Sequence, residues 1–304
     1  MPSTSNYKSI VLLLLDITSI QSYNTLIENA AERLQDNGAL DIVILPKISK
    51  LNQLDQLLAE IYTLSTGITQ RTNKSHLEIS VLFNEHYAEI ESPDWELIIL
   101  DDNDSTAYDE FKYKDKQTVK VLNVYRSNRE PIHLHLDEDE SEESSHQVVA
   151  VGGTFDHFHD GHKILLTAAA FVSSTTVIVG VTDQELLASK KYQEFLQSYD
   201  YRVNRMVRFL KHIKPSLEVK PHAIRDVCGP TGYIENIDAL IVSRETIKGG
   251  YYVNKTRKEK GFHELVLHVI NVVGGEEEDG FQNKLSSTQL RKEQFELVQK
   301  GLTK

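Results

Sequence analysis

The stretch Val-Val-Ala-Val-Gly-Gly-Thr-Phe-Asp-His-Phe-His-Asp-Gly-His, residues 148–162, joins a continuous apolar run to a glycine pair and a helix-compatible segment. A short apolar run of this kind is typical of a strand buried in a parallel sheet. Gly152 and Gly153 lack the Cβ atoms that would keep an anion away from the main chain, so the turn can aim its N–H groups at a phosphate. A helix that begins near Asp160 would add its positive end there. The stretch therefore predicts a phosphate site after a buried strand.

Two histidines, His159 and His162, strengthen this interpretation, because a glycine pair alone is usually an ordinary turn. Side chains three residues apart on the first turn of a helix face the same way. Both imidazoles would donate N–H groups where the turn holds phosphate. The alternatives are two surface histidines or a metal pair. A metal site is disfavoured because the chain has one cysteine and no complementary Cys or His cluster at zinc spacing, so we predict no metal bound by protein ligands.

Length and composition limit the class of protein. A chain of 304 residues is long enough for two domains. The formal charge of -12 argues against nucleic acid as a main partner, since backbone binding needs a basic surface. The single cysteine, Cys228, excludes a disulfide framework and fits a reducing compartment. The apolar run 10–15 is too short to span a bilayer and lacks the flanks of a signal peptide. We therefore expect no membrane span and a cytoplasmic location, with the nucleus as the alternative.

The second half alternates between strand-like and helix-like segments. Strands are predicted at 148–151, 176–181, 217–220, 238–242 and 265–273, and helices at 164–172 and 200–214. In the helix at 200–214 the apolar stripe is expected to be buried, which would leave four basic residues on the other side: Arg202, Arg205, Arg208 and Lys211. This βαβ rhythm predicts a parallel sheet with helices on both faces and a site at the carboxyl ends of its strands.

The first half shows the same alternation without a phosphate motif. Strands are predicted at 9–17, 40–45, 77–83, 96–100 and 118–124, and amphipathic helices at 26–34 and 51–64. We expect a second α/β domain with a structural or interaction role. The alternative is a catalytically inactive copy of the second domain, although no internal repeat is strong enough to establish it.

An acidic run separates the two halves. Residues 137–145 read Asp-Glu-Asp-Glu-Ser-Glu-Glu-Ser-Ser, a block of like charges with nothing to bury. A solvated tether is favoured over a regulatory segment. The predicted domains are 1–130, an α/β domain of unknown role, 131–146, the acidic linker, and 147–304, the domain that carries the phosphate motif.

Two further clusters follow that motif. Ser286, Ser287 and Thr288 precede a helix at 288–297, and Arg291 lies one turn into it. One interpretation makes a serine the N-cap of the helix, and the other has this helix start and Arg291 bind the β- and γ-phosphates of a nucleotide. In the second cluster a strand end, a glycine pair and a helix start again form an anion-binding pattern. Its candidate phosphate ligands are Arg244, Lys248, Asn254 and Arg257.

These motifs resemble those of a known family. The run Gly-Gly-Thr-Phe-Asp-x-Phe-His-x-Gly-His resembles the (His/Thr)-x-Gly-His motif of the nucleotidyltransferase superfamily, and Leu-Ser-Ser-Thr-x-x-Arg at 285–291 is similar to its Ile-Ser-Ser-Thr-x-x-Arg motif. The segments 190–203 and 242–257 resemble eukaryotic phosphopantetheine adenylyltransferases. The resemblance covers about residues 147–300. It implies a C-terminal Rossmann-like parallel-sheet nucleotidyltransferase domain, preceded by a second α/β domain, in a fungal monofunctional form.

The resemblance also implies an activity: transfer of the adenylyl group of ATP to 4′-phosphopantetheine, with Mg²⁺ accompanying ATP. His162 and His159 would stabilise charge on the α-phosphate, and Thr154 with Lys190 would hold the attacking phosphate, with Lys191 as the fallback. Asp156 is expected to be a turn former. The residues expected to bind ATP are Gly152, Gly153, Phe155, Ser286, Ser287, Thr288 and Arg291.

Two other functions stay open at this point. Cytidylyltransferases share the first motif, but they typically carry Arg-Thr-x-Gly-Ile-Ser-Thr-Thr, which the segment 283–288 does not match. A scaffold protein that organises other coenzyme A biosynthesis enzymes is the non-enzymatic alternative, and the intact histidine and Ser-Ser-Thr-x-x-Arg motifs argue against it. No Gly-x-x-x-x-Gly-Lys-(Ser/Thr) occurs, so we expect no kinase domain.

Overall fold

The structure is a computed structural model that describes residues 6–126, 145–271 and 287–300, apart from 75, 92, 105 and 189. The chain divides into two compact units. The first comprises Met1–Glu142 and Ile213–Pro215, and the second comprises Glu143–His212 and Ser216–Lys304. Most of the predicted linker lies outside the described residues, so its boundaries stay predictions.

The first unit contains a five-stranded sheet with strand order β3-β2-β1-β4-β5. All of its pairings are parallel. The strands are β1 (Tyr7–Leu14), β2 (Leu34–Ile44), β3 (Glu78–Leu82), β4 (Leu97–Asp101) and β5 (Lys120–Val124). The helices are α1 (Asn24–Arg33), α2 (Leu51–Arg71) and α3 (Ala107–Glu110), with 3-10 turns η1 (Ile20–Tyr23), η2 (His86–Glu89) and η3 (Lys116–Thr118). The predicted α/β alternation of this half is confirmed.

Strand β2 shows where the apolar pattern misses an element boundary. It begins at Leu34, six residues before the predicted start, and its first half is irregular. Asn37 has a φ of 61°, and a Cβ on Gly38 would lie 2.9 Å from the carbonyl oxygen of Gln35. Only glycine fits that close approach. The polar start of β2 therefore carries no period-two signal, and only its buried second half could be predicted.

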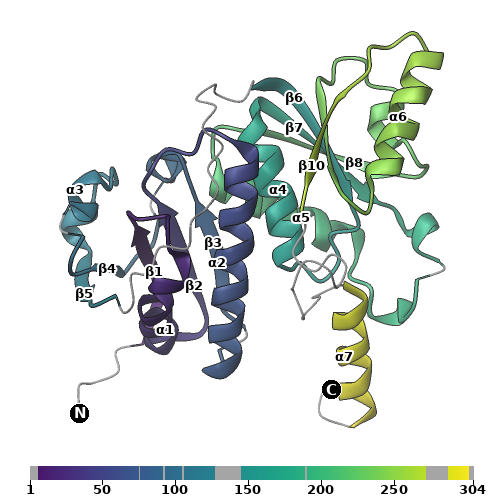
Figure 1. Cartoon of the computed structure of the whole chain (residues 1–304). Helices are drawn as coiled ribbons and strands as arrows, with labels where there is room; N and C mark the ends of the chain where they lie inside the picture. Colours follow the sequence, from purple (N-terminus) through teal and green to yellow (C-terminus); the bar gives the residue numbers. More distant parts are fainter. Residues whose placement is uncertain are drawn as a thin grey trace. The chain divides into compact units, whose positions relative to one another are not determined.

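The second unit contains another five-stranded parallel sheet, in the order β10-β9-β6-β7-β8. The strands are β6 (His146–Gly153), β7 (Ser173–Thr182), β8 (Glu218–Ile224), β9 (Ala239–Ser243) and β10 (Val266–Ile270). The helices are α4 (Asp160–Val172), α5 (Tyr199–Ile213), α6 (Ile247–Glu259) and α7 (Ser287–Gln299), with 3-10 turns η4 (Gln184–Leu187), η5 (Gln193–Phe195) and η6 (Gly229–Gly232). Figure 1 shows α4 and α5 on one side of this sheet and α6 on the other, as predicted.

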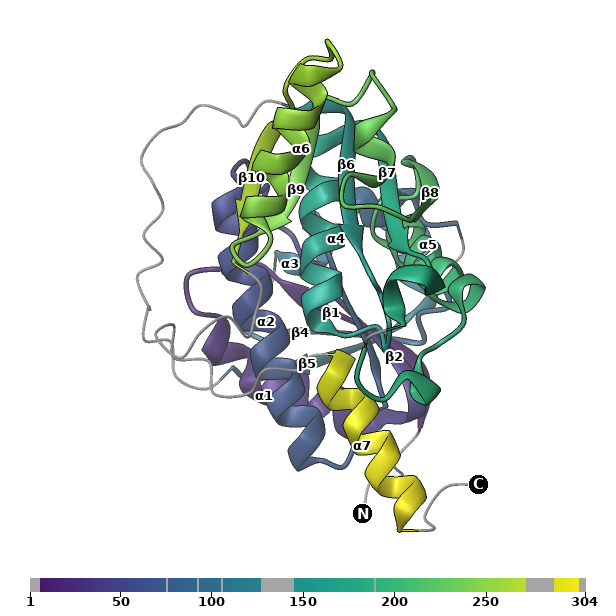
Figure 2. The same cartoon turned by 90° about the vertical axis from the view of Figure 1, so that its right-hand side faces the viewer.

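Strand β6 occupies the centre of the second sheet, between β7 and β9 (Figure 2). Its residues Val149, Ala150 and Val151 are buried, as an apolar run covered on both faces requires. The chain continues from β6 to β7 in one direction and returns to β9 on the other side, so the strand order reverses beside β6. Ligands of such sheets bind outside the carboxyl ends of the strands at this point of reversal. The glycine turn of the first motif lies there.

Helix α5 corrects one prediction. Arg202, expected on the exposed side of the helix, is 0% exposed. The buried residues of the helix are Arg202, Met206, Phe209, Leu210 and Ile213. This set has the i, i+4, i+7, i+8, i+11 spacing of one helix face, so the buried stripe begins with an arginine. A charged residue is assigned to the surface by default, and that assumption was wrong for Arg202.

The helices were compared with the length and hydropathy that a membrane span needs. Within the ranges that the structure describes, no helix is both long enough and apolar enough to cross a bilayer.

Candidate active site

The turn after β6 is shaped by an aromatic ring rather than by glycine dihedral angles. A Cβ on Gly153 would lie 3.1 Å from the ring of Phe155, which is 0% exposed. Phe155 and His157 have φ values of 52° and 45°, in the left-handed region that side chains rarely adopt. Such backbone costs energy and gathers at functional sites. Because the Phe155 ring is buried, its predicted contact with ATP can involve only the main chain in this conformation.

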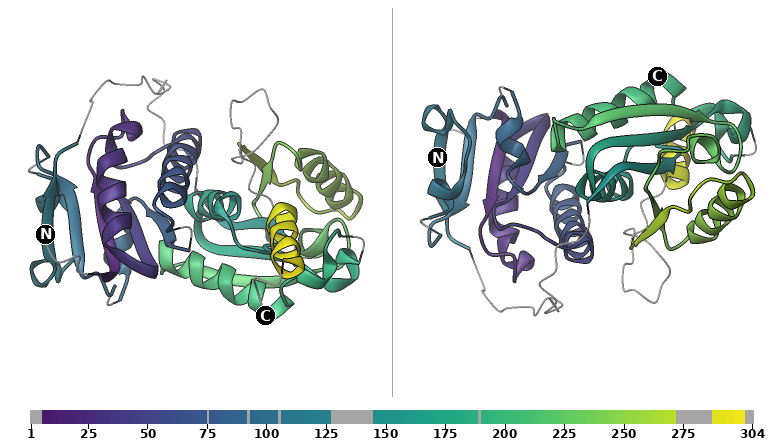
Figure 3. Two further views of the ribbon diagram at one scale, coloured as in Figure 1. Left: turned by 90° about the horizontal axis from the view of Figure 1, so that it is seen from below. Right: turned by 90° about the horizontal axis from the view of Figure 1, so that it is seen from above.

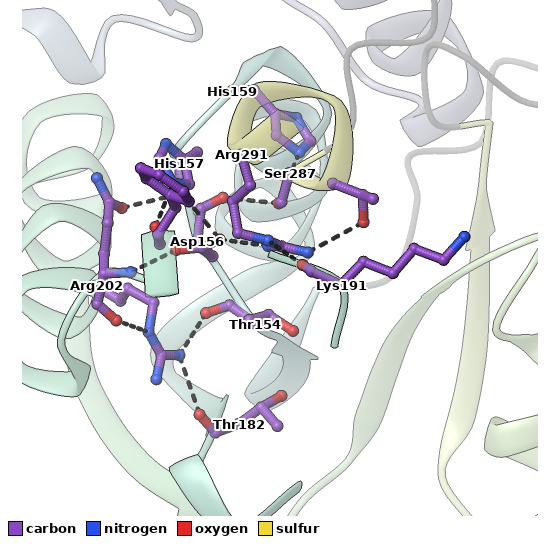
Figure 4. Close-up of polar contacts among 12 residues, drawn as sticks. Thr154, Asp156, His157, His159, Thr182, Lys191, Arg202, Ser287 and Arg291 are labelled. Carbon is purple, nitrogen blue, oxygen red and sulfur yellow. Dashed lines mark hydrogen bonds and ion pairs between the residues drawn. The ribbon is translucent and has the colours of Figure 1, made fainter. Parts of the chain in front are cut away.

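Neighbouring segments hold this strained turn in place. The Gln197 N–H donates to Asp156 Oδ1 at 2.9 Å, and the His157 N–H donates to Gln197 Oε1 at 2.8 Å. His157 Nε2 lies 2.9 Å from the carbonyl oxygen of Phe195. Figure 4 shows this cluster of contacts. The segment just before α5 thus fixes the turn that precedes the two predicted catalytic histidines.

The two histidines lie against each other at the start of α4. Their ring centroids are 3.9 Å apart, and the rings are stacked. The His159 N–H donates to His162 Nδ1 at 3.4 Å. Because Nδ1 of His162 accepts a hydrogen bond, a neutral His162 carries its proton on Nε2. Nε2 of His162 is then a hydrogen-bond donor, which is the group that the phosphate prediction requires.

Both imidazoles are neutral at pH 7. Burial lowers the pKa of His159 to about 4. Burial also holds the pKa of His162 well below its usual value, and the adjacent His159 lowers it further. Desolvation disfavours the charged form of a buried imidazole. The pair is therefore neutral rather than cationic, and a neutral N–H donor such as His162 Nε2 can stabilise charge that develops during a reaction without binding any anion strongly beforehand.

Helix α7 meets the turn through Ser287. The Ser287 hydroxyl donates to the carbonyl oxygen of Asp156 at 2.7 Å and lies 3.4 Å from His159 Nε2. A hydroxyl that has donated its hydrogen can only accept from His159, which places the His159 proton on Nε2. Figure 3 shows α7 in yellow. The structure thus brings together the first motif and the Ser-Ser-Thr-x-x-Arg motif, although Ser286 lies outside the described residues.

Arg291 occupies a different position from the one predicted. Its Nη1 donates to Asp156 Oδ2 at 2.5 Å, its Nη2 to Thr288 Oγ1 at 3.1 Å, and its Nε to the Lys191 carbonyl oxygen at 3.1 Å. Arg291 and Asp156 are both buried. In this conformation the guanidinium is bound inside the chain, so contact with the β- and γ-phosphates stays a prediction that requires Arg291 to leave Asp156.

Asp156 is the residue whose importance the sequence did not indicate. It was expected only to form a turn. Its carboxylate contacts Arg291 and the Gln197 N–H, and its carbonyl oxygen accepts from Ser287. The sequence could have indicated this pairing, because Asp156 and Arg291 belong to two motifs that were expected to form one site. Opposite charges of that kind pair when both are buried.

The predicted basic ligands divide into two groups. Lys190, Lys191, Arg244 and Lys248 have exposed side chains. Arg244 directly follows β9, and Lys248 lies in the first turn of α6, both near the carboxyl edge of the sheet. Figure 4 shows the Lys191 side chain extending away from the Asp156 cluster. A role for these four residues in binding phosphate stays a prediction.

Asn254 and Arg257 have structural contacts instead. Asn254 Nδ2 donates to the carbonyl oxygen of Leu265, and its Oδ1 accepts from the Leu265 N–H. Arg257 is 0% exposed and donates to four carbonyl oxygens, those of Thr231, Ile234, Glu235 and His263. These bonds tie α6 to the segments around it. In this conformation both side chains are engaged with the main chain, so their role in binding phosphate stays a prediction.

The described part of the chain contains no group of three or more His, Cys, Asp or Glu side chains placed to hold a metal ion.

The sequence is similar to those of known proteins. The cytidylyltransferase-like family model matches residues 150–293, from β6 into α7. The second unit is thus a cytidylyltransferase-like, Rossmann-like domain. A phosphopantetheine adenylyltransferase of Saccharomyces cerevisiae is 39% identical over 258 residues, which cover 83% of this chain and 82% of that protein. The chain belongs to the phosphopantetheine adenylyltransferase family.

Two other relatives show how the similarity is distributed. An uncharacterised protein of Schizosaccharomyces pombe is 30% identical over 312 residues, covering 95% of this chain and 98% of that protein. A phosphopantetheine adenylyltransferase of Pyrococcus furiosus is 36% identical over 128 residues, covering 42% of this chain but 79% of that protein. Less than half of this chain therefore suffices to match most of the archaeal relative.

Proposed function

We propose that this protein transfers the adenylyl group of ATP to 4′-phosphopantetheine, giving dephospho-coenzyme A and pyrophosphate. Membership of the phosphopantetheine adenylyltransferase family supports the choice of substrates. The structural observation that carries the proposal is the stacked, neutral His159–His162 pair beside the glycine turn, at the carboxyl edge of a parallel sheet. Both the scaffold and the donors suit a site for nucleotide phosphates.

The proposed reaction is a direct in-line displacement. An oxygen of the 4′-phosphate forms a bond to the α-phosphorus of ATP, and the bond from that phosphorus to the bridging oxygen breaks to release pyrophosphate. The attacking oxygen is already anionic, so no side-chain nucleophile is needed. The protein's contribution is to position the two phosphates and to stabilise the charge that grows on the α-phosphate oxygens.

Individual residues take distinct parts in this proposal. His162 donates from Nε2 to the α-phosphate, and His159 supports it by stacking and through its main-chain N–H. The main chain at Gly152 and Gly153 faces the phosphates, and Thr154 with Lys190 holds the attacking group. Ser287 and Thr288 bring the start of α7 to the same place. Mg²⁺ that accompanies ATP would supply positive charge to the phosphates, and it would need few protein ligands because Mg²⁺ commonly keeps its waters.

The partners beyond the substrates are proposed more coarsely. Other enzymes of coenzyme A synthesis are the proposed associates, and the first unit, whose edge carries no glycine turn, is the proposed surface for them. A cytoplasmic location is proposed with them.

A substrate panel tests the proposal. The full-length protein is incubated with ATP or CTP in combination with 4′-phosphopantetheine, phosphocholine, phosphoethanolamine or glycerol 3-phosphate, and pyrophosphate release is measured. Turnover is expected with ATP and phosphopantetheine alone. Turnover with CTP and phosphocholine, and none with ATP and phosphopantetheine, would show that the protein is a cytidylyltransferase.

A further inference from the structure

Arg202 lies behind the glycine turn with its side chain fully buried, in the first turns of α5. Its guanidinium donates to three carbonyl oxygens from three different segments. Nη1 reaches Thr154 at 2.6 Å and Thr182 at 3.0 Å, and Nε reaches Gln197 at 3.1 Å. Figure 4 shows the guanidinium between Thr154 and Thr182. One side chain thus joins the turn, the end of β7 and the segment before α5.

The two threonine carbonyls lie where the pairing of β6 with β7 ends. The last paired residues of the two strands are Gly153 and Val181. Thr154 and Thr182 follow them directly, and the Thr182 hydroxyl donates to the Gly153 carbonyl oxygen at 3.2 Å. Arg202 donates to the carbonyl oxygens of both Thr154 and Thr182, and so extends the connection between the two strands by one residue. This fixes the main chain at Thr154, the first residue beyond the sheet.

Arg257 provides a comparison within the same unit, because both arginines are fully buried and bound to main-chain carbonyls. Arg257 donates to four carbonyls and leaves no nitrogen without a partner. Arg202 has three such bonds, and its buried Nη2 has no hydrogen-bond partner. Within the described ranges no carboxylate forms an ion pair with Arg202. Burial lowers the pKa of Arg202, and the carboxylates of Asp156 and Asp183, which favour its charged form, offset this only in part. A buried arginine with an unpaired nitrogen is therefore costly at this place.

We propose that Arg202 is a positioning residue for the transfer step. It holds the Thr154 main chain so that the Thr154 hydroxyl meets the attacking phosphate, and it places a fixed positive charge behind the turn that receives the phosphates. The inference rests on the proposed function, because Thr154 is the residue proposed to hold the attacking group. Arg202 acts through Thr154 and is not proposed to touch the substrate.

The test uses Arg202→Lys, which keeps the charge but loses the forked geometry, and Arg202→Met, which loses both. Arg208→Lys and Arg208→Met are matched controls, because Arg208 is exposed on the same helix. A misplacement of about 1 Å at a reacting group can cost about a hundredfold in rate, so Arg202→Lys should lower kcat by about tenfold to a hundredfold. Calorimetric affinity for ATP should stay close to that of the unchanged protein, and Arg208 variants should match it in kcat.

A double-mutant cycle with Thr154→Ala separates positioning from general structural support. If Arg202 acts through the Thr154 hydroxyl, the loss from Arg202→Lys should shrink to less than about threefold once that hydroxyl is absent. Equal losses in both backgrounds would overturn the inference, as would Arg202 variants that lose their fold by circular dichroism. An unchanged protein without adenylyltransferase activity would instead refute the proposed function, so the two failures are distinguishable.

Discussion

The two units contain sheets of the same strand order with different chemistry at their carboxyl edges. In each unit the first strand is central, the second and third follow on one side, and the fourth and fifth lie on the other. In the second unit the first strand ends in Gly152 and Gly153, and a neutral histidine pair follows. In the first unit β1 is followed by Asp16, and β4 ends in Asp101. The shared scaffold therefore does not determine the function; the residues at the edge do.

The edge of the first unit is filled by its own side chains. Arg126 is 2% exposed and pairs with two carboxylates. Its Nη2 lies 3.1 Å from Asp16 Oδ2, and its Nε lies 3.0 Å from Asp101 Oδ2. Its guanidinium carbon also lies 4.5 Å from the centre of the Tyr23 ring. Two carboxylates at the point where a phosphate would bind repel an anion. This difference is the reason why we propose the second unit, and not the first, as the nucleotide site.

The largest effect is expected from breaking the buried ion pair of each unit in turn. Asp156→Asn removes the carboxylate charge that pairs with buried Arg291, and Arg126→Met removes the guanidinium that pairs with Asp16 and Asp101. Removing one partner of a buried pair typically costs about 3 to 5 kcal/mol of stability. Both variants should lower the free energy of unfolding measured by urea titration. Only Asp156→Asn should also abolish most of the turnover.

The contrast between these two variants is the informative outcome. An Arg126→Met protein that stays folded at the assay temperature but loses adenylyl transfer would show that the first unit contributes to the site. The comparison between the two edges would then be wrong.

The next effect concerns His162. Replacing it with alanine should lower kcat by about a hundredfold to a thousandfold, as is typical for loss of one donor aimed at developing charge. Affinity for ATP, measured by calorimetry, should change little, because a neutral donor acts mainly in the transition state. The control is His76→Ala, an exposed histidine of the first unit. Unchanged turnover by His162→Ala would remove this residue from the mechanism.

A smaller effect is expected from pH. The pKa of His159 is about 4 in the folded chain, against roughly 6.5 for an unfolded histidine. The unfolded state therefore binds more protons between these values, and stability is lost as the pH falls through this window. At pH 5 the loss for His159 should be about 2 kcal/mol relative to pH 7.5. Urea titrations at both pH values give the loss of unfolding free energy for the unchanged protein and for His159→Gln. The loss should be larger by this amount in the unchanged protein. Equal losses in the two proteins would contradict the burial of a neutral His159.

The sequence predicted the fold more completely than the roles of charged residues. Apolar runs such as 148–151 mark buried strands because a strand covered on both faces must be apolar, and every predicted strand exists. The common strand order was not predictable, because it depends on long-range pairing that leaves no local pattern. The polar start of β2 was not predicted either, because it shows no alternation of apolar and polar residues.

The arginines show where sequence reasoning about the site reaches its limit. Arg202, Arg257 and Arg291 contact main-chain carbonyls, and a carbonyl acceptor leaves no residue-type signal in the sequence. Arg257 was therefore interpreted as a phosphate ligand and Arg202 as a surface residue. The contact between the two histidines was predictable because it depends on two side chains at a fixed helical spacing. The motifs thus predicted which residues lie together in the fold, whereas burial and main-chain contacts showed what the arginines bind.

Adenylyl transfer by the second unit alone tests the central claim most directly. A fragment of residues 145–304 is purified, its fold is checked by circular dichroism, and kcat is measured with ATP and 4′-phosphopantetheine beside the full chain. Because the glycine turn, the histidine pair and α7 all lie in this fragment, its kcat is expected to be close to that of the full chain. A folded fragment without turnover would contradict the account, since the first unit would then supply part of the active site.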